Sequence, residues 1–115
     1  WKRRRGLSLF WREMVYIHEQ VYADLDLVFN GMLHWNKAKL SFAFVEQYID
    51  DIITHCYAID RENYHFAAKY SEHKRYGAYI YRYRRNKQTI WYIIYDMDIY
   101  GNIFVNKIIS NYTTL

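Results

Sequence analysis

The sequence contains very little cysteine, proline or glycine. Its 115 residues include one cysteine, no proline and four glycines. The single cysteine, Cys56, cannot form an internal disulfide, which is typical of a protein of the reducing cytoplasm. Cys56 lies among apolar residues at helical spacing, so we expect a buried thiol rather than a nucleophile. The glycines are too few and too scattered for a phosphate-binding loop or a nucleophile elbow, which excludes those nucleotide-binding and hydrolase motifs.

Long hydrophobic runs and metal-ligand spacings are also absent. The longest uninterrupted apolar run, residues 90–95, is much shorter than the ~20 residues that a membrane-spanning helix needs. We therefore expect no membrane partner. The five histidines form no His-x-x-x-His pair, and there is no Cys-x-x-Cys pair. These absences argue against a zinc site, and we expect no metal and no cofactor.

Tyrosine and basic residues are abundant instead. There are 14 tyrosines, and 16 lysines and arginines face 12 acidic residues, which gives a net charge of +4. Clustered positive charge attracts polyanions, although ordinary solvated surface charge is the alternative. Besides residues 2–5, the cations gather in the last third of the chain, at Lys74, Arg75, Arg82, Arg84, Arg85 and Lys87.

The first half of the chain has the pattern of a helical hairpin. Its length corresponds to a single domain of residues 1–115. Residues 3–9 are predicted to form a short first strand. Apolar residues then recur at spacings of three and four over residues 10–28, which predicts a helix capped by Ser8 and ended by Gly31. 

A second amphipathic helix is predicted over residues 37–57, and together the two helices form an αα-hairpin. Residues 60–77 are polar and rich in histidine and tyrosine, without a clear period. We predict a loop there, with one helical turn around residues 64–70. Its end, which includes His73, leads directly into the last third of the chain.

That last third predicts a small antiparallel sheet. Three β-rich runs, residues 79–85, 90–96 and 103–109, are joined by tight turns, which gives a three-stranded meander with the middle run at its centre. The expected fold class is α+β, with an N-terminal strand and an αα-hairpin packed on a small antiparallel sheet.

The first of these runs carries alternating tyrosine and arginine. Alternation puts Arg82 and Arg84 on one face of the sheet and Tyr79, Tyr81 and Tyr83 on the other. We expect the tyrosines to pack on the helices and the arginines to line the open face. A solvated, merely solubilising arginine face is the alternative.

The order strand, helical hairpin, loop and meander resembles the RelE/ParE superfamily of bacterial toxins. The resemblance is carried by Tyr79-x-Tyr-Arg-Tyr-Arg84, by Trp91-Tyr-Ile-Ile-Tyr-Asp96 and by the aliphatic run after Gly101. These segments match the family's basic strand, its central strand and its last strand. The resemblance implies the cytoplasmic toxin of a type II toxin–antitoxin system, with a cognate antitoxin as partner.

The resemblance implies two possible targets. One branch of the superfamily cleaves mRNA on the ribosome, and the other inhibits DNA gyrase without nuclease chemistry. At two positions where the cleaving branch would have arginine, this chain has Tyr92 and Tyr112. A protein-interaction domain that shares only the shape is a third possibility, and it would show apolar surface at the sheet face or a hairpin.

Metal-free RNA cleavage needs a base for the 2′-hydroxyl, an acid for the leaving oxygen and cations for the charge that develops on phosphorus. Arginine supplies forked donors for that charge, and tyrosine or histidine can transfer the protons. The candidate catalytic residues are therefore Arg82, Arg84, Tyr92 and Tyr112, with His73 as a further candidate for proton transfer. A solvated loop position is the alternative for His73. The candidate nucleic-acid-binding residues are Lys74, Arg75, Arg85, Lys87 and Lys107.

Overall fold

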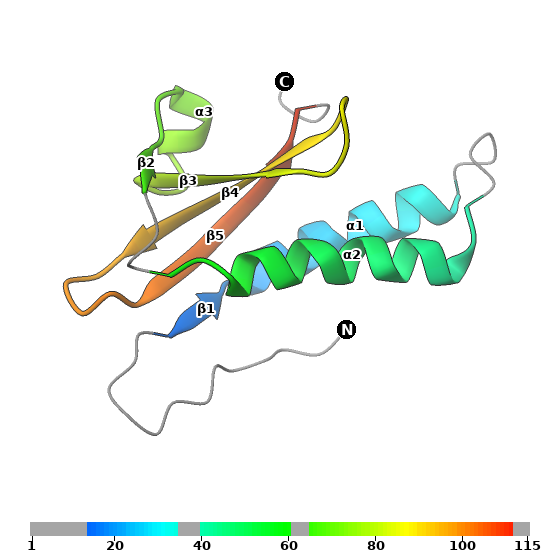
Figure 1. Cartoon of the computed structure of the whole chain (residues 1–115), viewed down its shortest axis with the longest axis horizontal. Helices are drawn as coiled ribbons and strands as arrows, with labels where there is room; N and C mark the ends of the chain where they lie inside the picture. Colours follow the sequence, from blue (N-terminus) through cyan, green and yellow to red (C-terminus); the bar gives the residue numbers. More distant parts are fainter. Residues whose placement is uncertain (1–13, 35–39, 61–64, 112–115) are drawn as a thin grey trace.

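The computed structural model describes residues 14–34, 40–60 and 65–111 of the chain. Within these ranges, two long helices lie along one face of a five-stranded sheet, and a short helix lies over the other face (Figure 1). The long helices are α1 (Glu19–Leu33) and α2 (Phe42–Tyr57), and the short one is α3 (Ser71–Lys74). The predicted α+β class is confirmed. None of the described helices is long and apolar enough to cross a membrane.

The predicted antiparallel meander forms the centre of the sheet. The strands are β1 (Val15–Ile17), β2 (Phe66–Ala67), β3 (Tyr79–Arg84), β4 (Ile90–Met97) and β5 (Ile103–Ser110), in the spatial order β1-β5-β4-β3-β2. β4 is central, and β3 and β5 run antiparallel to it. β1 pairs with β5 in parallel, so the complete sheet is mixed.

The first helix begins later than its apolar spacing suggests. β1 precedes it and α1 starts only at Glu19, so the prediction of one helix over residues 10–28 is wrong in the region of β1. His18 is the N-cap, and its ring Nδ1 accepts a hydrogen bond from the amide two residues further on (2.9 Å). The predicted cap Ser8 and the predicted strand at residues 3–9 lie outside the described residues.

Parallel pairing with β5 explains why this segment is a strand. The Ile103 amide donates to the Met14 carbonyl (2.8 Å), and the His18 amide donates to the Val105 carbonyl (2.9 Å). Met14 and Ile17 also fit the spacing of the following helix. These long-range hydrogen bonds therefore decide between two conformations that the local pattern leaves open.

The ends of the long helices also differ from the prediction. Gly31 lies inside α1, which runs on to Leu33, and the amide of the C-cap residue His34 donates to the Asn30 carbonyl (3.1 Å). The prediction that Gly31 ends the helix is therefore wrong. α2 begins after its N-cap Ser41, whose hydroxyl accepts a hydrogen bond from a first-turn amide (3.1 Å).

The main hydrophobic core lies between the two long helices and the sheet. Burying each of its large aliphatic side chains stabilises the fold by about 1.5–3 kcal/mol. Cys56 lies in this core, where burial raises the pKa of its thiol to about 12, so the prediction of a buried thiol is confirmed. The fully buried members include Val21, Leu25, Ile49, Ile52, Ile93, Ile103 and Val105.

The segment that contains α3 covers part of the opposite face of the sheet. The helical turn predicted around residues 64–70 lies instead at α3. Ala68, Ile80 and Ile94 are buried, and they belong to this second, smaller apolar layer rather than to the main core. Gly77 allows the close approach, since a Cβ at this residue would lie 2.8 Å from the carbonyl oxygen of Tyr95.

Candidate nucleic-acid interface

The alternation of β3 separates its arginines from its tyrosines, as the sequence predicts. Tyr79, Tyr81 and Tyr83 are partly buried against the main core, whereas Arg82 and Arg84 are exposed on the opposite face. The tyrosines therefore contribute to packing between sheet and helices, and the arginines are left facing solvent.

Tyr92 lies on the same face as the two arginines. In the β3–β4 register Arg82 is directly opposite Tyr92, and directly opposite residues of neighbouring strands share a face. Tyr92 is half-buried. Arg84 donates to the Lys87 carbonyl in the hairpin (3.3 Å), while Arg82 makes no side-chain hydrogen bond to any residue in the described ranges. Arg82 is thus exposed next to an aromatic residue of the neighbouring strand, and its guanidinium is available to an external anion.

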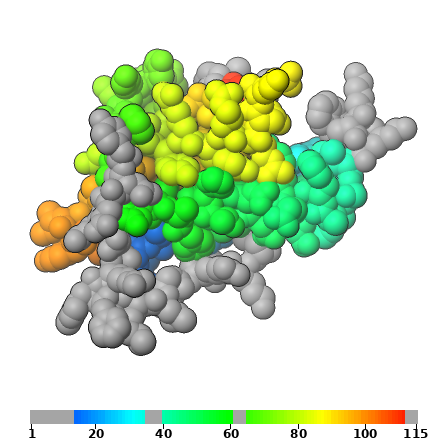
Figure 2. Space-filling view, in the orientation of Figure 1, coloured from blue at the N-terminus to red at the C-terminus, as the bar shows by residue number. Residues whose placement is uncertain are grey.

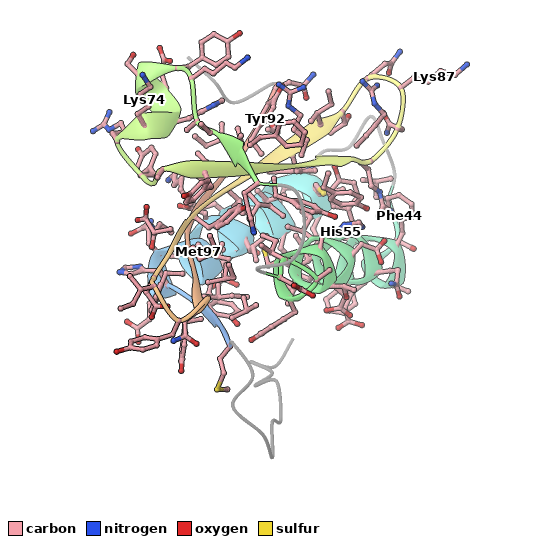
Figure 3. All side chains as sticks on the ribbon, turned by 60° about the vertical axis from the view of Figure 1, so that its left-hand side comes forward. Phe44, His55, Lys74, Lys87, Tyr92 and Met97 are labelled. Carbon is pink, nitrogen blue, oxygen red and sulfur yellow. The ribbon has the colours of Figure 1, made fainter. Side chains whose placement is uncertain are left out.

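Two lysines border this pair. Figure 3 shows Tyr92 between Lys74, at the end of α3, and Lys87, in the β3–β4 turn, with both on the side of the sheet away from α1 and α2. Both lysines are exposed. We refer to Lys74, Arg82, Arg84, Lys87 and Tyr92 as the basic face.

His73 lies beneath the surface of this face. Its side chain is only 5% exposed, so it is not in a solvated loop. Its ring lies 5.2 Å from the Tyr92 ring and 5.7 Å from the Tyr70 ring, centroid to centroid. The predicted proximity of His73 to the basic face is therefore observed, but the imidazole supports the Tyr92 ring rather than facing solvent.

Polar contacts hold the α3 segment in this position. The Asn106 side-chain amide donates to the Tyr76 carbonyl (2.8 Å) and to the Asp96 carboxylate (3.0 Å), and the other oxygen of that carboxylate accepts from the Ala78 amide (2.9 Å). Asn106 is the residue of β5 without a partner on β4, at the irregularity in the register. A β-bulge thus helps to position the Tyr92–His73 contact.

Arg85, in contrast, lies on the helical side. It forms an ion pair with Asp51 of α2, donates to the Tyr83 hydroxyl (2.9 Å) and stacks over the Tyr48 ring (4.4 Å). Figure 2 shows the β3–β4 hairpin, in yellow, directly over α2, in green. The sequence grouped Arg85 with the nucleic-acid-binding residues, but its charge is used within the molecule.

The contacts of Arg85 belong to a polar network that sequence reasoning missed. His55 stacks on Tyr83 (3.9 Å between centroids, 15° between planes) and its Nδ1 lies 3.2 Å from the Tyr81 hydroxyl. Burial lowers the pKa of His55, against the opposing effect of Asp51. Burial acts to raise the pKa of Asp51, but hydrogen bonds from Arg85 and another side chain outweigh it and hold that pKa below its usual value. Asp51 and His55 are four residues apart, so in a helix their side chains lie on the same face. This spacing was the one sign of the network in the sequence.

Arg75 and Lys107 are not counted with the basic face, because both are engaged at the Tyr76 ring. They approach the Tyr76 ring, each with its cationic group 5.3 Å from the ring centroid. The Lys107 Nζ is also 2.8 Å from an oxygen of Asp24 on α1. That oxygen accepts no well-aligned hydrogen bond, so the contact is an ion pair held by charge. These two cations are beside the edge of β5.

The chemistry available on the basic face is that of anion binding and aromatic stacking. The described residues contain no cluster of three histidine, cysteine or acidic side chains that could hold a metal. Tyr112, the remaining candidate catalytic residue, lies outside the described residues. The fold and this face together define an α+β chain with a basic, aromatic sheet surface. Comparisons with protein-family models, with curated proteins and with solved structures find no match to this chain.

Proposed function

We propose that this protein is a toxin of the RelE/ParE type that acts on RNA at the ribosome through its basic face. The observation that carries the proposal is the cross-strand pair of Arg82 and Tyr92 on the exposed face, bordered by Lys74 and Lys87. Arginine and lysine contact phosphates, and an aromatic ring stacks on unpaired bases. A cognate antitoxin is the expected protein partner.

RNA cleavage on this face would depend on two arginines and one tyrosine. Arg82 and Arg84 would stabilise the charge that develops on the reacting phosphate, and the Tyr92 hydroxyl would transfer a proton. His73 is buried against the Tyr92 ring, so in this mechanism it positions that ring and does not touch the substrate.

The test is inhibition of bacterial growth on induced expression. We expect the Arg82→Ala/Arg84→Ala double variant to be produced in folded form and to be harmless, because both residues are exposed and neither supports the core. The Arg75→Ala variant is the control, since it removes a cation that is not on the basic face. A double variant as toxic as the unchanged protein would contradict the proposal.

A gyrase inhibitor of the ParE type, without catalysis, is the second candidate. The burial of His73 favours it, because Tyr92 is then the only described candidate on the face with a group for proton transfer. Primer extension on mRNA after induction separates the two functions. Codon-phased cuts support RNA cleavage, whereas intact mRNA with stalled replication supports gyrase inhibition.

A further inference from the structure

Tyr70 is an exposed aromatic residue at the start of α3, on the same side of the sheet as the basic face. Its side chain is 64% exposed. The Tyr70 carbonyl accepts hydrogen bonds from the amides of His73 (3.0 Å) and Lys74 (2.9 Å), so its backbone is held in place. A ring that is fixed at its backbone and open to solvent offers a flat surface on which a ligand can stack.

One buried imidazole contacts both Tyr70 and Tyr92. The His73 ring lies 5.7 Å from the Tyr70 ring, at 89° between their planes, and 5.2 Å from the Tyr92 ring, at 35°. His73 is 5% exposed, whereas Tyr70 is exposed and Tyr92 is half-buried. We refer to these three residues as the aromatic cluster. It extends the ring surface of the basic face from Tyr92 to a second, more exposed tyrosine.

The charge around the aromatic cluster is positive. Lys69 and Lys74 precede and follow it closely in the sequence, and both are exposed. Glu72 is the acidic residue of α3, and it lines the same cleft as Arg75, which offsets its charge. The two lysines therefore remain, and the basic face adds two arginines beyond Tyr92. Phosphate groups are favoured in such surroundings.

We propose that Tyr70 is a second stacking residue of the RNA site, so that the protein binds a single strand with two unpaired bases, one on the Tyr92 ring and one on the Tyr70 ring. This inference rests on the proposed function, because it specifies the form of RNA that the basic face accepts. Aromatic rings stack on every base, so the site distinguishes single strands from duplexes rather than one sequence from another. His73 is buried and does not contact the RNA.

The first measurement is the binding of a short labelled single-stranded RNA to the full chain by fluorescence anisotropy. Tyr70→Ala should weaken binding about tenfold, as expected for the loss of one stack between a base and a ring, and Tyr70→Phe should bind as the unchanged protein does. Tyr100→Ala is the matched control and should have no effect, because Tyr100 is 70% exposed but lies in the β4–β5 turn. Equal affinities of Tyr70→Ala and the unchanged protein overturn the proposal.

Strands without bases separate stacking from charge. A strand of the same length whose riboses carry no bases keeps its phosphates, so Tyr70→Ala should bind it as tightly as the unchanged protein does. One base and then two bases, neighbouring or one position apart, should raise the affinity of the unchanged protein in two steps. The second step should be absent from Tyr70→Ala and from Tyr92→Ala. If Tyr70→Ala weakens binding of the base-free strand equally, Tyr70 does not act by stacking and the proposal is wrong.

A duplex of the same sequence tests the preference for single strands. Its bases are paired and stacked on one another, so it should compete at least tenfold less well than the single strand. Equal competition by the duplex would show that unpaired bases are not bound, which overturns the proposal.

Failure of this inference differs from failure of the proposed function. If the unchanged protein binds no RNA, or if Arg82→Ala/Arg84→Ala leaves RNA binding intact, the proposed function fails and the second stacking residue fails with it. If RNA binding depends on the two arginines but not on Tyr70, only the second stacking residue is overturned. Urea denaturation of each variant confirms that the fold is retained, which we expect because Tyr70 is on the surface.

Discussion

At the scale of single residues, the contacts and the exposure of a side chain determine whether it can bind an external ligand. Arg82 and Arg85 have similar positions in the sequence of β3 and its turn, yet one faces solvent and the other is bound to Asp51. His73 is polar and precedes two cations, yet it is almost completely buried. Contacts across the fold, rather than residue type, therefore separate the candidate binding groups from the structural ones.

Gly77 gives a prediction at this scale. The Gly77→Ala substitution should destabilise the protein by about 1–3 kcal/mol, because its new Cβ would meet the Tyr95 backbone at 2.8–2.9 Å and Tyr95 is held in the central strand β4. Gly31→Ala is the matched control. Nothing lies within 4 Å of its Cβ position, so alanine should stabilise α1 by about 0.5–1 kcal/mol. Chemical denaturation measures both, and equal effects of the two substitutions would contradict the packing described for Gly77.

At the scale of secondary-structure elements, the sheet was predictable and its surroundings were less so. The strands of the meander follow from alternation and turn residues, and Gly101, with φ 87°, occupies the predicted β4–β5 turn. β1 was missed because Met14 and Ile17 fit helical spacing equally well. The position of α3 over Tyr92 depends on the bulge at Asn106, which has no local signal in the sequence.

The same limits apply to the candidate site. The shared face of Arg82, Arg84 and Tyr92 follows from strand alternation once the β3–β4 register is known. The partners of Arg85 and Lys107 could not be predicted, because Asp51 and Asp24 are far away in the sequence and on helices whose rotation against the sheet is set by the whole core.

The contact between α2 and β3 should make stability depend on pH in two ranges. The pKa of His55 is lowered by burial, so unfolding takes up a proton there and stability falls as the pH drops through about 6.5, the usual histidine value. The pKa of Asp51 is held below its usual value, so a second loss of stability is expected as the pH falls below about 4.

Variants separate the two ranges. His55→Phe keeps a ring against Tyr83 and should flatten the upper range, whereas Asp51→Asn should flatten the lower one. The measurement is the free energy of unfolding by urea as a function of pH. If both variants kept the full pH dependence of the unchanged protein, the assignment of these two groups would be wrong.

At the scale of the whole molecule, the charges are divided between two layers. α1 and α2 carry six acidic residues and no lysine or arginine. The exposed cations of the basic face are on the other side of the sheet (Figure 3). A polyanion would be attracted to one side of the molecule and repelled by the other, so the modest net charge of +4 understates the local field.

This division gives the central claim its most direct test, which is the binding of a labelled single-stranded RNA measured by fluorescence anisotropy over a range of salt concentrations. The account predicts that Arg82→Ala/Arg84→Ala weakens binding and makes the slope of log K against log salt less steep, by the amount expected for the loss of about two phosphate contacts. Tyr92→Ala should weaken binding without that change of slope. Arg75→Ala should have little effect on either quantity. RNA binding that is equally strong in the Arg82→Ala/Arg84→Ala variant, or equally weakened by Arg75→Ala, would contradict the assignment of the basic face.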